Sequence, residues 1–357
     1  MAKDKVKNKL CTDLLVETLA VQATSKNDSD MIEYLKEKIK SYGLKYSQDT
    51  YGNIYVTKGN SKLYSCIVSH IDTVHKIYGT FEIFQSEDLL FAFSPTEGEQ
   101  VGIGGDDKVG VTICLNALRD LSNIKVVFFK DEEVGCLGSK EADMKFFLNC
   151  NIVLQADRRG NGDFINIASG TTLCSKAFTD DIKPILDAHE YVLTTGMMTD
   201  VMTLKDKGLG VSAANISCGY YSPHSSKEIV SISDVEDCYE MMLEIIEPCE
   251  GIGYSHVQYK AKEKSIPHST AYDYGKKYLG YDRFTDEYHS YPSYENPRKS
   301  VKMLHETNPM MEFPGESDAE DLEEYLEEID ICVSDLKSVL DDYITVREKL
   351  TEKLGKV

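Results

Sequence analysis

The 357-residue sequence contains no run of about 20 apolar residues, so we expect no membrane-spanning helix. Its first residues are rich in charge and are not followed by an apolar stretch, so we also expect no secretory signal. There is no P-loop, no GxGxxG dinucleotide-binding motif and no internal repeat. These absences argue against membrane proteins, common nucleotide-binding folds and repeat arrays.

Basic residues are also fewer than acidic ones. The sequence has 39 Lys and Arg and 60 Asp and Glu, which gives a formal net charge of −21. Such a charge disfavours binding to nucleic acid or to an anionic membrane surface. The ten cysteines include no CxxC pair, and several, such as Cys66 and Cys114, lie inside apolar runs. Cysteines of this kind are typical of core residues in a reducing compartment, so we expect a cytoplasmic protein without disulfides.

Strand-like and helix-like segments alternate along the first 250 residues. The turn at 51–53 predicts strands at 44–50 and 54–57 on its two sides. Largely apolar runs predict strands at 64–69, 125–129 and 152–155, and 208–216 predicts a turn and a strand. Helical periodicity predicts two helices within 10–43 and further helices at 111–118 and 233–246. The alternation predicts an α/β fold, with a three-layer arrangement of a mostly parallel or mixed sheet and helices on both faces.

Composition divides the chain into three parts. Residues 1–250 carry the α/β pattern, and residues 251–315 are rich in tyrosine and predict a linker or a docking segment. Residues 316–357 are acidic with an apolar stripe at helical spacing and predict a helical tail. The stripe either packs on the chain's own domain or allows self-association as a coiled coil.

Short motifs of acidic residues and histidine follow the predicted strands or stand at glycine-rich turns. They are His70-Ile71-Asp72, Asp106-Asp107-Lys108, Asp131-Glu132-Glu133, Asp157 and His224. Ligands of parallel sheets bind at the carboxyl ends of the strands, where these motifs fall. Zinc-type ions take His nitrogen and carboxylate oxygen, and a pair of ions needs a shared anionic ligand and activates water. The ordered set therefore predicts a two-metal hydrolase site, although each motif alone is more often structural.

Some roles within this site can be inferred from spacing. Asp72 lies two residues beyond His70, so in an extended chain it can orient that ligand. Glu132 and Glu133 are adjacent at a strand end and can divide into one metal ligand and one general base. Spacing alone does not tell which of the two is the base.

The same residues resemble the co-catalytic di-zinc exopeptidases, the family of peptidase T, aminoacylase and carboxypeptidase G. The matching segments lie within residues 10–247 and are Leu35–Gly59, Ser69–Val74, Gly105–Gly110, Asp131–Gly135, Asp157 and Cys218–Ser225. The resemblance implies two divalent metal ions, with zinc expected and cobalt or manganese as alternatives. It also implies the following roles: His70 and Asp157 bind one ion, Glu133 and His224 bind the other, Asp106 bridges them, Glu132 is the general base and Asp72 orients His70.

One departure concerns a lid or dimerisation domain that many family members carry between the Asp ligand and the last His. Only 66 residues, 158–223, separate Asp157 from His224, so this chain resembles the lidless, single-domain form. The grip on substrate that the lid supplies must then come from elsewhere. The tyrosine-rich segment is one candidate.

The leading hypothesis is a metal-dependent exopeptidase, an aminopeptidase acting on short peptides through a two-metal-activated water and Glu132. An amidohydrolase or deacylase of N-acyl amino acids would use identical ligands. A hypothesis from another class is a catalytically retired binding or scaffold protein that acts through its C-terminal tail. The complete set of site residues argues against that loss of catalysis.

Further residues are candidates at the edge of the site. Asp200 lies in a Thr/Gly/Met-rich loop before a predicted helix and is a candidate for substrate binding. Arg158 directly follows a predicted ligand and either holds a substrate carboxylate or offsets the local acidity. His75 lies off the motif of His70, and we interpret it as a loop residue.

Overall fold

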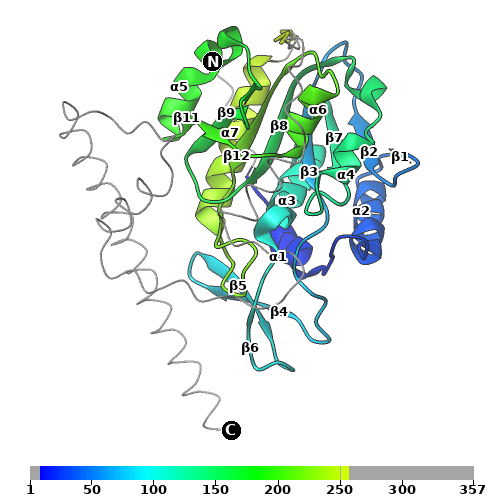
Figure 1. Ribbon diagram of the computed structural model, residues 1–357, viewed down its shortest axis with the longest axis vertical. Coiled ribbons are helices and arrows are strands. Elements are labelled where there is room, and N and C mark those ends of the chain that lie inside the picture. The colour runs from blue at the N-terminus through cyan, green and yellow to red at the C-terminus, as the bar shows by residue number, and fades with distance from the viewer. Residues whose placement is uncertain (1–8, 250, 257–357) are drawn as a thin grey trace, which may run out of the picture. The chain divides into compact units, whose positions relative to one another are not determined.

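A nine-stranded mixed sheet organises the computed structural model, which describes residues 9–249 and 251–256 (Figure 1). Its parallel core runs in the order β7 (Ile124–Phe129), β3 (Tyr64–His70), β8 (Cys150–Arg158) and β12 (Ser212–Ser217). The antiparallel strands β2 (Ile54–Lys58) and β1 (Tyr46–Gln48) extend it beyond β7. On the other side β12 pairs with β9 (Asp163–Ala168), which also pairs with β10 (Thr171–Thr172) and β11 (Val192–Gly196).

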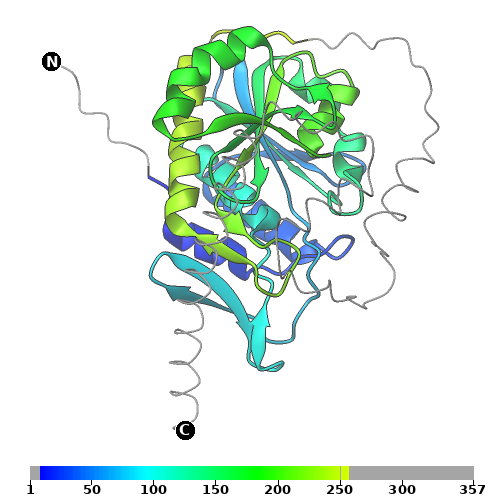
Figure 2. The same ribbon diagram turned by 60° about the vertical axis from the view of Figure 1, so that its left-hand side comes forward.

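Helices cover both faces of this sheet, which explains why the core strands are rich in apolar residues. Every residue of β3 and of β7 is buried. On one face lie α3 (Gly105–Asp120) and α7 (Ile232–Cys249), accompanied by α1 (Thr12–Ala20), α2 (Ser29–Ser41) and α5 (Lys176–Ala188) (Figure 2). On the other face lie α4 (Leu137–Lys140) and α6 (Asp200–Asp206), and a short 3₁₀ helix spans Met144–Phe147 (Figure 1). The predicted fold class is confirmed.

A second, five-stranded antiparallel sheet combines two distant segments of the chain. Its strands are β13 (Tyr220–Tyr221), β14 (Ile229–Ser231), β5 (Leu89–Ser94), β4 (Glu82–Ser86) and β6 (Glu99–Val101). The strands β4, β5 and β6 extend beyond the main sheet in both views (Figures 1 and 2). The sequence analysis did not predict this sheet.

The segment between Asp157 and His224 contains no separate lid domain. Its helices cover the main sheet, and its strands belong to the main sheet except for β13, which belongs to the second sheet. The cysteines of the described residues are all free thiols. No helix within residues 9–249 is long and apolar enough to cross a membrane. The predicted helical tail and nearly all of the predicted tyrosine-rich segment lie outside the described residues, so those two predictions and the division at residues 250 and 315 stay predictions.

Candidate metal centre

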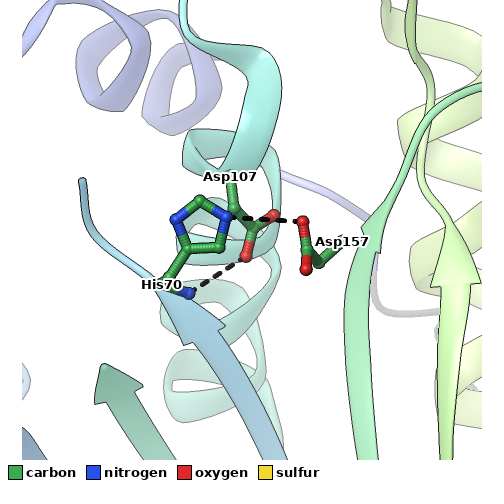
Figure 3. Close-up of side chains that lie close together, drawn as sticks. All are labelled: His70, Asp107 and Asp157. Carbon is green, nitrogen blue, oxygen red and sulfur yellow. Dashed lines mark hydrogen bonds and ion pairs between the residues drawn. The ribbon is translucent and has the colours of Figure 1, made fainter. Parts of the chain in front are cut away.

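The predicted site residues lie at neighbouring strand ends on one edge of the sheet. His70 is the last residue of β3 and pairs with Phe129 at the end of β7, which leads directly into the turn of Glu132 and Glu133. Asp157 is the next-to-last residue of β8, the other neighbour of β3. The side chains of His70 and Asp157 point toward each other at the start of α3 (Figure 3).

The carboxylate of Asp106 lies between the two histidines. Its Oδ1 is 3.1 Å from His70 Nε2 and its Oδ2 is 3.3 Å from His224 Nε2. Asp157 Oδ1 is 3.4 Å from the same nitrogen of His70, and Glu133 Oε1 is 3.2 Å from that of His224. The five predicted ligands thus come together as two groups that share Asp106.

The donor set of these groups fits divalent cations. Each group offers one imidazole and two carboxylates, which is the ligand chemistry that zinc takes. Ligand atoms of His70, Asp106 and Glu133 all lie within 4.8 Å of one another. Glu133 Oε1 is buried and, although it is close to His224, makes no hydrogen bond among the described residues. An acceptor left in this way is what a bound cation would satisfy.

The pKa values indicate an excess of negative charge at the site. Burial lowers the pKa of His70, but Asp157, Asp106 and Asp72 outweigh burial and raise that pKa well above its ordinary value. Close contacts with the carboxylates of Asp106 and Glu133 raise the pKa of His224 to about 11. The acids of the site thus favour positive charge on the two histidines, a charge that a divalent ion could supply instead.

Asp72 orients both His70 and the turn with the two glutamates. Its backbone oxygen accepts a hydrogen bond of 2.9 Å from His70 Nδ1, which leaves Nε2 of the ring facing the site. Its carboxylate accepts hydrogen bonds from the Ser25 hydroxyl at 2.6 Å and from the backbone N–H of Glu132 at 3.0 Å. The N–H of Glu133 lies 3.4 Å from the same carboxylate. A single residue therefore connects a histidine on one strand with the acids that follow the next strand.

The two glutamates face different partners. Glu132 Oε2 is 4.0 Å from His70 Nε2, whereas Glu133 is in direct contact with His224. Glu132 Oε1 accepts a hydrogen bond of 3.1 Å from the Cys136 thiol, and burial raises the pKa of Glu132 to about 8. Glu132 therefore lies beside the ligand cluster with a carboxyl group that can hold and release a proton near neutral pH.

Asp107 fixes the junction between β3 and α3, a role that the sequence analysis did not predict. Its buried carboxylate accepts hydrogen bonds from the backbone N–H of His70 at 3.2 Å and of Gly110 at 3.0 Å (Figure 3). A Cβ atom at Gly110 would overlap this carboxylate and the backbone oxygen of Ala156. Only glycine therefore allows α3 to lie this close to the strand that carries Asp157.

Asp200 lies behind the ligand cluster. Its side chain is fully buried at the start of α6, and its Oδ2 accepts a hydrogen bond of 3.2 Å from Gln155 Nε2. The same amide group donates to Asp157 Oδ2 at 2.9 Å, so Gln155 joins the two acids. Burial raises the pKa of Asp200 to about 6. Contact between Asp200 and a substrate stays a prediction.

Arg158 is engaged with a neighbouring acid. Its Nε donates to Asp163 Oδ2 at 2.7 Å, which favours the interpretation that it offsets local acidity. A role in holding a substrate carboxylate stays a prediction. His75 lies in a loop, as expected, but it also contacts the buried carboxylate of Glu228, which the sequence analysis did not single out.

Comparisons with known proteins agree with this geometry. Residues 92–241 match the family described as M42 glutamyl aminopeptidase, while no curated protein sequence matches the chain. The aminopeptidase PepT of Bacillus cereus is 13% identical with a TM-score of 0.56, over 66% of this chain and 97% of that chain. A tripeptidase of Staphylococcus aureus is 13% identical with a TM-score of 0.53, over 68% and 98%.

A third solved structure, an aminopeptidase of the archaeon Desulfurococcus kamchatkensis, is 18% identical with a TM-score of 0.50, over 66% of this chain and 94% of that chain. At these identities the likeness shows the fold, whereas the family match rests on sequence. The matched residues include Asp106 and all the predicted site residues that follow it. The resemblance to the di-zinc exopeptidases is thereby confirmed, because residues 92–241 match the family described as M42 glutamyl aminopeptidase.

Proposed function

We propose that this protein is a metal-dependent aminopeptidase that removes N-terminal residues from short peptides. The observation that carries the proposal is the carboxylate of Asp106, whose two oxygens face two different histidines at 3.1 and 3.3 Å. In this proposal His70 and Asp157 hold one ion, Glu133 and His224 hold the other, and Asp106 is shared. The ions are zinc, with cobalt or manganese as alternatives.

Ions bound in this way polarise a scissile carbonyl and lower the pKa of water. The protein's own contribution is proton transfer by Glu132, whose Oε2 lies 4.0 Å from His70 Nε2. Glu132 takes the proton of the attacking water and then gives it to the leaving amine. Burial supports this role because it raises the pKa of Glu132 to about 8, which is close to neutral pH. A carboxyl group with such a pKa can both take and release a proton under those conditions.

The match of residues 92–241 to the M42 glutamyl aminopeptidase family favours peptides with a free N-terminus over N-acyl amino acids as substrates. The solved structures with a similar fold are named as aminopeptidases and a tripeptidase. The ligands themselves do not separate the two reactions, since an amidohydrolase would use the same residues. The distinction therefore depends on the substrate.

A matched panel of substrates tests the proposal. The full chain is treated with a chelator, reloaded with zinc, cobalt or manganese, and assayed on dipeptides, tripeptides, the same peptides with acetylated N-termini, and N-acyl amino acids. We expect cleavage of the free peptides, loss of activity on chelation and recovery on reloading. Faster hydrolysis of the N-acyl amino acids would favour a deacylase instead. A protein that binds no metal and cleaves nothing would point to the retired binding protein.

A further inference from the structure

We propose that Glu228 is a positioning residue that fixes the bridging Asp106 relative to His224. The inference rests on the proposed function, in which Asp106 is the ligand shared by the two ions. Glu228 itself touches none of the predicted ligand atoms. It acts through the backbone of the segments that carry them.

The carboxylate of Glu228 is fully buried and surrounded by donors. Its Oε1 accepts a hydrogen bond of 3.1 Å from the backbone N–H of Asp106. Its Oε2 accepts a hydrogen bond of 2.7 Å from the backbone N–H of Gly104 and lies 2.7 Å from His75 Nε2. Because charge-assisted hydrogen bonds of this kind are strong, the carboxylate holds the loop before α3 in place, and with it the backbone of the bridging ligand.

Glu228 also closes the loop that carries His224. The loop joins β13 to β14, and Glu228 is the last residue before β14 begins at Ile229. The Ser225 hydroxyl donates to the backbone oxygen of Ser222 at 2.7 Å, and the N–H of Glu228 donates to the backbone oxygen of Ser225 at 3.3 Å. These bonds make the loop compact, so the position of Glu228 determines the position of His224.

A third ligand segment meets the same carboxylate through His75, five residues after His70. The ring of His75 lies against Gly102, where any Cβ atom would overlap it. The segments that follow His70, precede Asp106 and contain His224 are therefore joined at one point. We call this point, formed by Glu228, His75 and the N–H groups of Gly104 and Asp106, the Glu228 clamp.

The substitution Glu228→Gln tests the clamp with little change in volume. The amide has one acceptor oxygen, so its NH₂ group must face a donor and one backbone N–H loses its partner. We expect Asp106 to shift and the chelator-treated full chain to bind cobalt roughly ten- to a hundredfold more weakly, which is the range typical of residues that support metal ligands. Cobalt binding is followed by visible absorption, and kcat should fall while KM for a tripeptide changes little.

Asp88→Asn is the matched control. Asp88 accepts hydrogen bonds from the backbone N–H of Ser233 at 2.9 Å and from the Ser231 hydroxyl at 2.8 Å. These bonds lie at the end of β14 that is opposite to the His224 loop. A purely structural loss should lower the melting temperature of both variants. Only Glu228→Gln should also weaken cobalt binding and lower kcat.

His75→Phe is a second variant in case Glu228→Gln fails to fold. It keeps a ring against Gly102 but removes a donor from the clamp, so cobalt binding should weaken in the same direction and by less. Wild-type cobalt affinity and kcat in the folded clamp variants would overturn the inference and leave the proposed function intact. If the wild-type chain itself bound no cobalt, zinc or manganese, the proposed function would fail first.

Discussion

The two histidines that face Asp106 lie in opposite surroundings. The side chain of His70 is 1% exposed, ends a fully buried strand and is held by Asp72 and Asp107. The side chain of His224 is 43% exposed and belongs to a loop, with a left-handed φ of +61°. One half of the centre is thus built by the core of the fold and the other by a hairpin loop. We expect the His70 half to keep its ion when the His224 half has already lost its own.

Asp106→Asn should have the largest effect, because it removes the feature that the two halves share. Each half loses part of a ligand, so neither ion is held well, and several kcal/mol of transition-state stabilisation are lost. Activity should fall by roughly a thousandfold or more. Metal content after gel filtration and kcat/KM on a tripeptide measure the change. Retention of both ions with near-normal activity would refute the bridge.

Glu132→Gln should separate proton transfer from metal binding. Glu132 lies beside the His70 half without direct contact to either histidine, so both ions should remain bound. The rate should fall by roughly a hundredfold or more, because the amide cannot take the proton. Metal analysis and single-turnover rates on the same preparation test this. A near-normal rate would remove Glu132 from the role of base.

His70→Ala and His224→Ala compare the two halves directly. In the metal-free protein, His70→Ala leaves buried carboxylates without their partner and should lower the free energy of unfolding by about 3 kcal/mol. His224→Ala, in a half-exposed loop, should lower it by less. Urea unfolding measures both values. After loading and desalting, the His224 variant should retain one ion, and equal losses in the two variants would contradict the asymmetry.

The smallest expected effect is the release of protons from the site when a metal ion binds. In the metal-free protein the pKa of His224 is raised to about 11 and that of His70 is also raised, so the site favours protons on both imidazoles. A metal ion binds only the neutral imidazole, so binding must release protons and the affinity must decrease as the pH falls. Titration calorimetry in buffers of different protonation enthalpy should reveal this release. It should be smaller in His224→Ala, and heats independent of the buffer would contradict the prediction.

The parts of the fold that the sequence predicts well are the strands buried on both faces. Runs such as 66–68 and 126–129 are apolar without interruption, and the motifs after them fall at one edge of the sheet by topology alone. The second sheet is less visible because its strands are half-buried and short. In β4, for example, no residue is fully buried and Glu82 and Gln85 are exposed.

Site residues divide in the same way. His70 and Asp157 could be predicted because each follows or ends an apolar strand. The roles of Glu132 and Glu133 can be assigned only from the resemblance. The two residues are adjacent, so their position in the sequence does not tell which of them faces His224. Glu228 could not be predicted at all. It stands beside Lys227 in a polar turn, and its partner His75 is 153 residues away in the sequence, so no local pattern marks the contact.

Gly110 offers a way to judge distant relatives of this protein from sequence alone. Because a side chain at this position would collide with the Asp107 carboxylate and the backbone of Ala156, α3 could not stay against the strand of Asp157. Consider a relative that keeps every histidine and acid of the centre but carries a larger residue there. Such a chain would have the complete set of ligands in the wrong places. The residue at position 110 would therefore identify inactive relatives that a search for the ligands alone would classify as enzymes.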